Sequence, residues 1–282
     1  MYSIKDPSHW VYRLIQSVVY QEMLHVELAC NVANAYSHLP KFDAPKYQGQ
    51  DIPHLNFRLD TPDPRTIYHP YSAEIGPLNL ERINAMCLIE YPEWFTGHKP
   101  DVQEDVTQYG SIGEFYDAVE VGASELVYDL QGNQNQINEF QYFYNEFTDP
   151  TITTDGGQGL SQALNLIKAI TDQGEGKTEG DVEIPEKYQN TADGFEESWS
   201  HFRKFTAIRD SKDSPEIYPY KIEPDEQGLK AQKILIDNFT EFRQILKRLF
   251  SGKDPGNFAP VMATLGGNIL NCWQHGALPK FS

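Results

Sequence analysis

The sequence has few cysteines, few basic residues and no long apolar run, and each shortage excludes a class of protein. Its three cysteines, Cys30, Cys87 and Cys272, are too few and too far apart for a disulfide framework or a thiolate zinc site. We expect them to pack in the core of a cytoplasmic protein. No apolar run approaches the roughly 20 residues that a membrane-spanning helix needs, so no membrane partner is expected.

The charge balance narrows the partners further. The 41 acidic residues outnumber the 23 basic ones, and the formal net charge of the 282 residues is -18. Such a field repels nucleic acids and anionic membrane surfaces. The hydrophobic content of 39% is still enough for a sizeable core. The composition therefore predicts a globular protein that does not bind polyanions.

Apolar residues recur at helical spacing along most of the chain. Helices are predicted at about Pro7–Tyr36, Leu78–Ile89, Ser111–Leu130, Leu160–Asp172, Gly194–Ile208, Glu226–Phe250 and Asn257–Trp273. Asp6 and Pro7 are expected to start the first of them. The fold class is therefore all-α, and no repeat or composition break divides residues 1–282 into two domains.

Long loops separate these helices. Seven prolines between Leu39 and Pro77 exclude a continuous helix there, and we expect an irregular excursion with a short strand at Leu55–Leu59. Gln131–Gly157, rich in amides and aromatics, is expected to form a covering loop. The architecture is thus a helical bundle with long irregular loops.

Glu22 and His25 form the sharpest local motif. A three-residue step on a helix, at about 100° per residue, leaves two side chains about 60° apart on one face. Helical bundles with di-iron or di-manganese sites take such an E-x-x-H motif from each of two helices. The alternative is a surface Glu beside a hydrogen-bonded His, but the apolar flanks of this motif favour a metal site.

Glu197 and His201 form a second pair. On a helix their four-residue step returns to within about 40° of the starting direction. Glu196 and Glu27 are turned away from the respective histidines by the same geometry, so we do not expect them to bind metal. The alternative is an exposed hydrogen bond between Glu197 and His201, or a first-turn Glu that interacts with the helix dipole.

Glu114 is a third candidate carboxylate. Ser111-Ile112-Gly113-Glu114 is a capping-box pattern, in which the Glu side chain accepts a hydrogen bond from a backbone N–H at the start of the helix. The residues alone favour this capping role over a metal ligand.

Other features carry no site. Gly156–Gly159 lacks the preceding strand and the Lys-Ser/Thr pair of a phosphate loop. The six remaining histidines stand singly, and no Ser or Cys lies in a nucleophile motif. Phosphate binding and acyl transfer are therefore not expected.

Four ordered parts of the sequence share a further pattern. They are Gln21–His25 with the following Ala29–Ala35, then Ser111–Tyr116, Thr171–Gly176 and Glu197–Phe205. In order and spacing they resemble the ferritin-like family named for iminophenyl-pyruvate dimer synthase, from about Met1 to the C-terminal helices. The resemblance implies a ferritin-like bundle, and it overrides the capping interpretation by implying the metal ligands Glu22, His25, Glu114, Glu197 and His201.

The resemblance also implies a class of reaction. Members named for the dimer synthase couple amino-acid-derived imines oxidatively in indole alkaloid pathways. A site of carboxylates and imidazoles suits iron or manganese, and zinc can also occupy it. We expect a non-haem di-metal oxidase or oxygenase that acts on a small organic substrate in secondary metabolism. The alternatives are a non-catalytic metal-binding or iron-handling protein and a scaffold that binds a partner.

Bundles of this kind take one more Glu from a helix before the first E-x-x-H helix. Relatives that this sequence resembles end that helix in a segment like Met1–Lys5. We therefore expect the sequence to lack the first bundle helix, to hold fewer than two tightly bound metals and to expose an apolar groove. A homo-oligomer is one way to complete the site.

Overall fold

The computed structural model describes residues 1–43, 49, 51–52, 55–59, 63–92, 101–140, 149–172, 199–253 and 256–282. Their α-helices are α1 (Trp10–Ala35), α2 (Leu80–Ile89), α3 (Ile112–Glu125), α4 (Gly156–Asp172), α5 (His201–Asp210), α6 (Glu226–Leu249) and α7 (Phe258–Gln274). The short 3₁₀ helices are η1 (Phe57–Leu59), η2 (Pro64–Thr66) and η3 (Val106–Gln108). An isolated bridge joins Ile4 to Ile217, and no strand occurs in the described part of the chain. The all-α prediction is confirmed.

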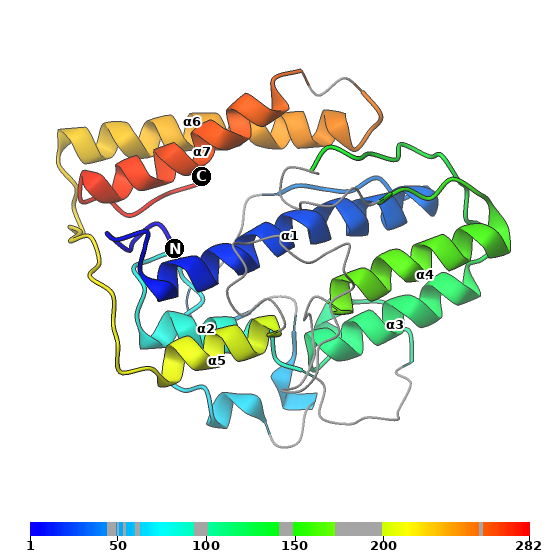
Figure 1. Ribbon diagram of the computed structural model, residues 1–282, viewed down its shortest axis with the longest axis horizontal. Coiled ribbons are helices and arrows are strands. Elements are labelled where there is room, and N and C mark those ends of the chain that lie inside the picture. The colour runs from blue at the N-terminus through cyan, green and yellow to red at the C-terminus, as the bar shows by residue number, and fades with distance from the viewer. Residues whose placement is uncertain are drawn as a thin grey trace.

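Helix α1 runs through the middle of the molecule, and the other helices pack around it in pairs (Figure 1). α2 and α5 contact each other beside the N-terminal half of α1, and α3 and α4 pair beside its C-terminal half. α6 and α7 form an antiparallel pair on the other side. Among the described helices, none is long and apolar enough to cross a membrane.

The core has two main parts that meet along α1. One contains Leu14 and Val18 of α1 together with residues of α2 and α5, and the other contains Leu24 and Leu28 of α1 with residues of α3, α4 and α6. The three cysteines are buried and unpaired, as expected for core residues. The part of α1 between Val18 and Leu24 therefore lies at the junction of the two apolar regions.

Two local predictions were wrong. His9, rather than Asp6, caps α1, because its side chain accepts a hydrogen bond from the backbone N–H of Val11. The expected strand at Leu55–Leu59 is instead the 3₁₀ turn η1, closed by a hydrogen bond from the N–H of Leu59 to the carbonyl of Asn56. The alternation of apolar and polar residues predicts a strand, but the segment is short, and the described residues provide no neighbouring strand to pair with it.

The predicted helix from about Gly194 begins later in the described chain. α5 begins at His201, and Ser200 is its N-cap, with an extended backbone and a side chain that accepts from the N–H of Arg203. Because Ser200 interrupts the helical geometry, the four-residue spacing from Glu197 to His201 does not by itself bring these side chains together. Glu196 and Glu197 lie outside the described residues.

A candidate metal centre

Three polar side chains share one face in the middle of α1. Gln21, Glu22 and His25 are related by three-residue and four-residue steps, which a helix places side by side. Gln21 is 2% exposed and His25 3% exposed. Burying polar groups among apolar side chains is costly unless they have partners. The sequence of α1 therefore places a polar cluster at the junction of the two core regions.

His201 reaches this cluster from α5. It is the first residue of its helix and is fully buried. Its Nδ1 lies 3.1 Å from Oε1 of Glu22, while Nδ1 of His25 lies 3.7 Å from Oε2 of the same carboxylate. The two imidazole rings stack with their centroids 5.5 Å apart. One ligand atom from each of the three residues lies within 4.8 Å of the others.

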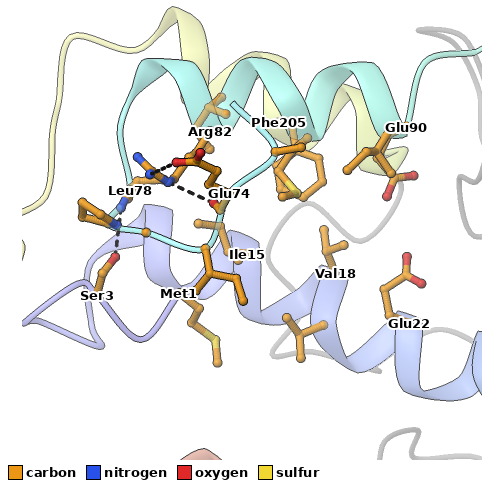
Figure 2. Close-up of a pocket in the computed structure, with 18 residues that line it drawn as sticks. Met1, Ser3, Ile15, Val18, Glu22, Glu74, Leu78, Arg82, Glu90 and Phe205 are labelled. Atoms are coloured by element: carbon orange, nitrogen blue, oxygen red, sulfur yellow. Dashed lines mark hydrogen bonds and ion pairs between the residues drawn. The ribbon is translucent and has the colours of Figure 1, made fainter. Parts of the chain in front are cut away.

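Glu90 supplies a second carboxylate that the sequence did not reveal. It is the C-cap of α2, and its Oε2 lies 3.5 Å from Nδ1 of His201. Figure 2 shows the carboxylates of Glu22 and Glu90 turned toward each other. A buried acid at a helix C-terminus faces the unfavourable end of the helix dipole. A Glu that directly follows a predicted apolar helix was therefore a usable signal.

Gln21 fixes the tautomer of His201. Its Oε1 accepts a hydrogen bond from Nζ of Lys204 at 2.8 Å, which identifies that atom as the oxygen because an ammonium can only donate. The same oxygen lies 3.0 Å from Nε2 of His201, so Nε2 must carry the proton. The lone pair of neutral His201 is therefore on Nδ1, which faces Glu22 and Glu90.

This arrangement fits a metal ion. Oε1 of Glu22 and Nδ1 of His201 are buried, both are electron-rich, and neither makes a hydrogen bond to any described residue. Two electron-rich atoms this close repel each other, and a cation between them would remove that repulsion. Two ligand atoms about 2.1 Å from one metal and at roughly 95–110° to each other are about 3.1–3.4 Å apart. The 3.1 Å from His201 to Glu22 and the 3.5 Å to Glu90 are close to that spacing.

The electrostatics favour the protonation states that bind metal. Burial lowers the pKa of His201, and the nearby Glu22 carboxylate opposes only part of this effect. Burial alone would raise the pKa of Glu22, but His25 and His201 together hold it well below its ordinary value. An ionised Glu22 beside a neutral His201 is the state in which both can donate electron pairs to a metal.

Of the other carboxylates weighed from the sequence, the structure describes Glu114 and Glu27. Oε2 of Glu114 accepts from the N–H of Gly110 at 2.8 Å, and the N–H of Glu114 donates to Oγ of Ser111, so Glu114 closes a cap at the start of α3. It does not belong to the group of Glu22, His25 and His201. Oε1 of Glu27 accepts from the N–H groups of Glu139 and Phe140, so it ties a loop to α1.

Comparison with known proteins places the chain in a family. The sequence model of the family described as ferritin-like matches residues 1–210 of this chain. The chain belongs to the ferritin-like family. The matched region contains α1 to α5 and with them all of the site residues described above, whereas α6 and α7 follow it. None of the curated proteins matches the chain.

A solved structure supports the same assignment along the whole chain. The chain is 46% identical to a ferritin-like protein from Caulobacter vibrioides, with a TM-score of 0.85 over 100% of this chain and 89% of that chain. The ferritin-like fold is one in which inward-facing Glu and His side chains hold metal pairs. In this chain Glu22 and His25 of α1 and His201 of α5 likewise come together between packed helices.

Proposed function

We propose that this ferritin-like protein is a non-haem oxidase or oxygenase that uses iron, or alternatively manganese, to act on a small organic molecule. Zinc can also occupy such a site. The group of Glu22, His25 and His201 carries the proposal, because two histidines and one carboxylate are the donor set of non-haem Fe(II) oxygenases. The resemblance of four sequence segments to iminophenyl-pyruvate dimer synthases supports an oxidative reaction in secondary metabolism.

The residues of the chain would have separate roles in binding the metal. Glu22 and Glu90 would supply carboxylate oxygens, and His25 and His201 would supply imidazole nitrogens. Gln21 holds the His201 ring so that Nδ1 faces the carboxylates. A bound iron or manganese ion would supply redox chemistry with dioxygen. The cluster borders a largely apolar cavity of about 380 Å³, into which Glu22 and Glu90 open, so a small molecule has room beside it.

The donor set supports a proposal about the number of metal ions. The described residues gather one carboxylate and two histidines within ligand distance of one another, and Glu90 adds a second carboxylate beside His201, which is enough to hold one ion. A pair of ions needs further carboxylates, and the family resemblance proposes Glu114 and Glu197 for that role. We expect fewer than two tightly bound equivalents in the isolated chain.

Anaerobic loading with Fe(II), followed by exposure to oxygen, tests the proposal. Absorbance, oxygen consumption and product analysis would follow the reaction, and metal content would be measured separately. The variant His25→Ala removes one donor. Glu27→Gln is the matched control, since it changes a buried carboxylate on the same helix that faces the loop at residues 139–140. We expect loss of iron and oxygen consumption in His25→Ala and retention of both in Glu27→Gln.

Two results would count against this function. Absence of iron and manganese uptake by the wild-type protein would remove its basis. Uptake with oxygen consumption but no oxidised product from any organic compound supplied would instead favour iron handling without turnover.

A further inference from the structure

Two parallel stripes of side chains line much of the cavity beside the metal centre, and Met1, Ser3, Phe205 and residues 73–78 complete the lining. On α1 the stripe is at positions 15, 18, 19 and 22, and on α2 it is at 82, 83, 86, 89 and 90, spacings that keep each set on one helix face. Both helices run in the same direction along the cavity (Figure 2). Each stripe therefore ends in a carboxylate of the candidate metal centre, Glu22 on α1 and Glu90 on α2.

Between its ends the cavity is almost entirely aliphatic. Phe205 of α5 contributes the aromatic ring among the cavity residues that Figure 2 labels. The aliphatic walls come from Ile15, Val18, Val19, Ile83, Met86 and Ile89. Such walls favour a flexible hydrocarbon chain, because they offer dispersion contacts and little stacking surface.

The end away from the metal centre holds an arginine in a long ion pair with a glutamate. Arg82 lies there beside Glu74, on the side opposite Glu90 in Figure 2. Nε of Arg82 donates to the backbone carbonyl of Glu74 at 3.1 Å. The carboxylate of Glu74 is 3.9 Å from Nη2, which is beyond hydrogen-bond distance. The Nη groups of Arg82 therefore have no hydrogen bond to any described residue.

The backbone holds this guanidinium in place. A Cβ on Gly76 would lie 2.2 Å from Cζ of Arg82, so the group rests directly on the glycine. The Arg82 side chain is 19% exposed and that of Glu74 is 53% exposed. Arg82 thus stands at the end of the cavity away from Glu22 and Glu90, with N–H groups able to receive a planar anion.

We propose that this cavity binds a straight-chain aliphatic monocarboxylate, with its carboxylate on Arg82 and its hydrocarbon chain directed at Glu22 and Glu90. The orientation toward a reactive metal rests on the proposed function, whereas the binding site itself does not. Arg82 and Glu90 are eight residues apart on α2, which corresponds to about 12 Å along the helix. With carbon–carbon bonds near 1.5 Å, an extended chain of roughly eight to ten carbons spans that length.

Titration calorimetry on the metal-free full chain, with the series from butanoate to tetradecanoate, tests the site. Each added CH₂ that is buried should tighten the Kd roughly fourfold, which corresponds to about 0.8 kcal/mol. The gain should stop near octanoate to decanoate, where the chain reaches the carboxylates. The matching primary alcohols should bind at least tenfold more weakly, because they lack the charged group that Arg82 holds.

Variants separate the two ends of the cavity. Arg82→Gln should remove the preference for acids over alcohols, whereas Glu74→Gln should tighten acid binding several-fold by removing a competing carboxylate. Met86→Trp should fill part of the cavity and so shorten the hydrocarbon chain that binds best. This variant still tests the site if Arg82→Gln does not fold. His25→Ala is the control at the metal centre and should bind the acids normally.

The outcomes distinguish this inference from the proposed function. Acid binding with the stated chain-length optimum, in a protein that takes up no iron, would uphold the site and refute the oxidase. Equal binding of acids and alcohols, or tighter binding of phenyl-substituted acids of the same length, would overturn the inference in a protein that still binds iron and consumes oxygen.

Discussion

Replacement of Gln21 by Met should weaken metal binding without removing a metal ligand. Oε1 of Gln21 accepts the Nε2 proton of His201 and a hydrogen bond from Lys204. Met has a similar length but offers no comparable acceptor, so His201 loses the contact that holds its Nδ1 toward Glu22. Loss of a group that orients a metal-binding histidine typically costs 10–100-fold in affinity, or about 1.4–2.7 kcal/mol.

Thermal denaturation converts this loss into a measurable shift. Metal supplied at about 100 times the wild-type Kd stabilises the folded state by about 2.7 kcal/mol. A roughly 30-fold weaker Kd lowers that gain to about 0.9 kcal/mol at the same metal concentration. At about 2–4 °C per kcal/mol, the metal-induced rise in Tm should fall from roughly 5–11 °C to roughly 2–4 °C.

The metal-induced change in Tm is the quantity to compare, because the substitution also removes buried hydrogen bonds and lowers the metal-free Tm. Gln16→Met is the matched control on the same helix, since the Gln16 side chain donates to the hydroxyl of Tyr20, away from His201. It should keep the full metal-induced rise. An unchanged rise in Gln21→Met would refute the argument that Gln21 orients His201.

Three further tests concern the surroundings of the site. Ser200→Ala should cost about 1 kcal/mol of stability by removing the cap of α5, and it should lower metal affinity because His201 follows directly. Its control, Ser111→Ala, should destabilise α3 and leave metal affinity unchanged. Equal metal affinities in the two variants would contradict this expectation. Glu90→Gln should weaken iron binding in a competition assay with a chelator, and wild-type affinity would remove Glu90 from the site. Glu114→Gln should keep both its cap and the first equivalent of metal, so loss of that equivalent in metal analysis would show that the carboxylate belongs to the central cluster.

The helices could be predicted from the sequence because their apolar spacing is a local property. The centre of α1 and the position of α6 followed from that spacing alone. Helix ends depend on individual side chains, and the start of α1 was missed because His9 competes as a cap with Asp6. The turn at Phe57 was missed because five residues of alternating apolar and polar character are too few to fix a conformation.

The site could be predicted only in part, because it depends on how separate helices pack together. Helical geometry places Glu22 and His25 on one face, but it does not say which other helices meet that face. His201 was selected for its spacing from Glu197, yet the structure brings it to Glu22 through the packing of α5 on α1. Glu90 is not part of an E-x-x-H motif, and its position at the end of α2 is the feature of the sequence that indicates it.

Crystals of the protein soaked with iron or manganese, measured at the absorption edge of the metal, test the central claim most directly. We expect anomalous density between Glu22, His25 and His201, at about 2.0–2.3 Å from one atom of each. Strong metal density elsewhere in the molecule, with none between these three side chains, would contradict the assignment of the centre.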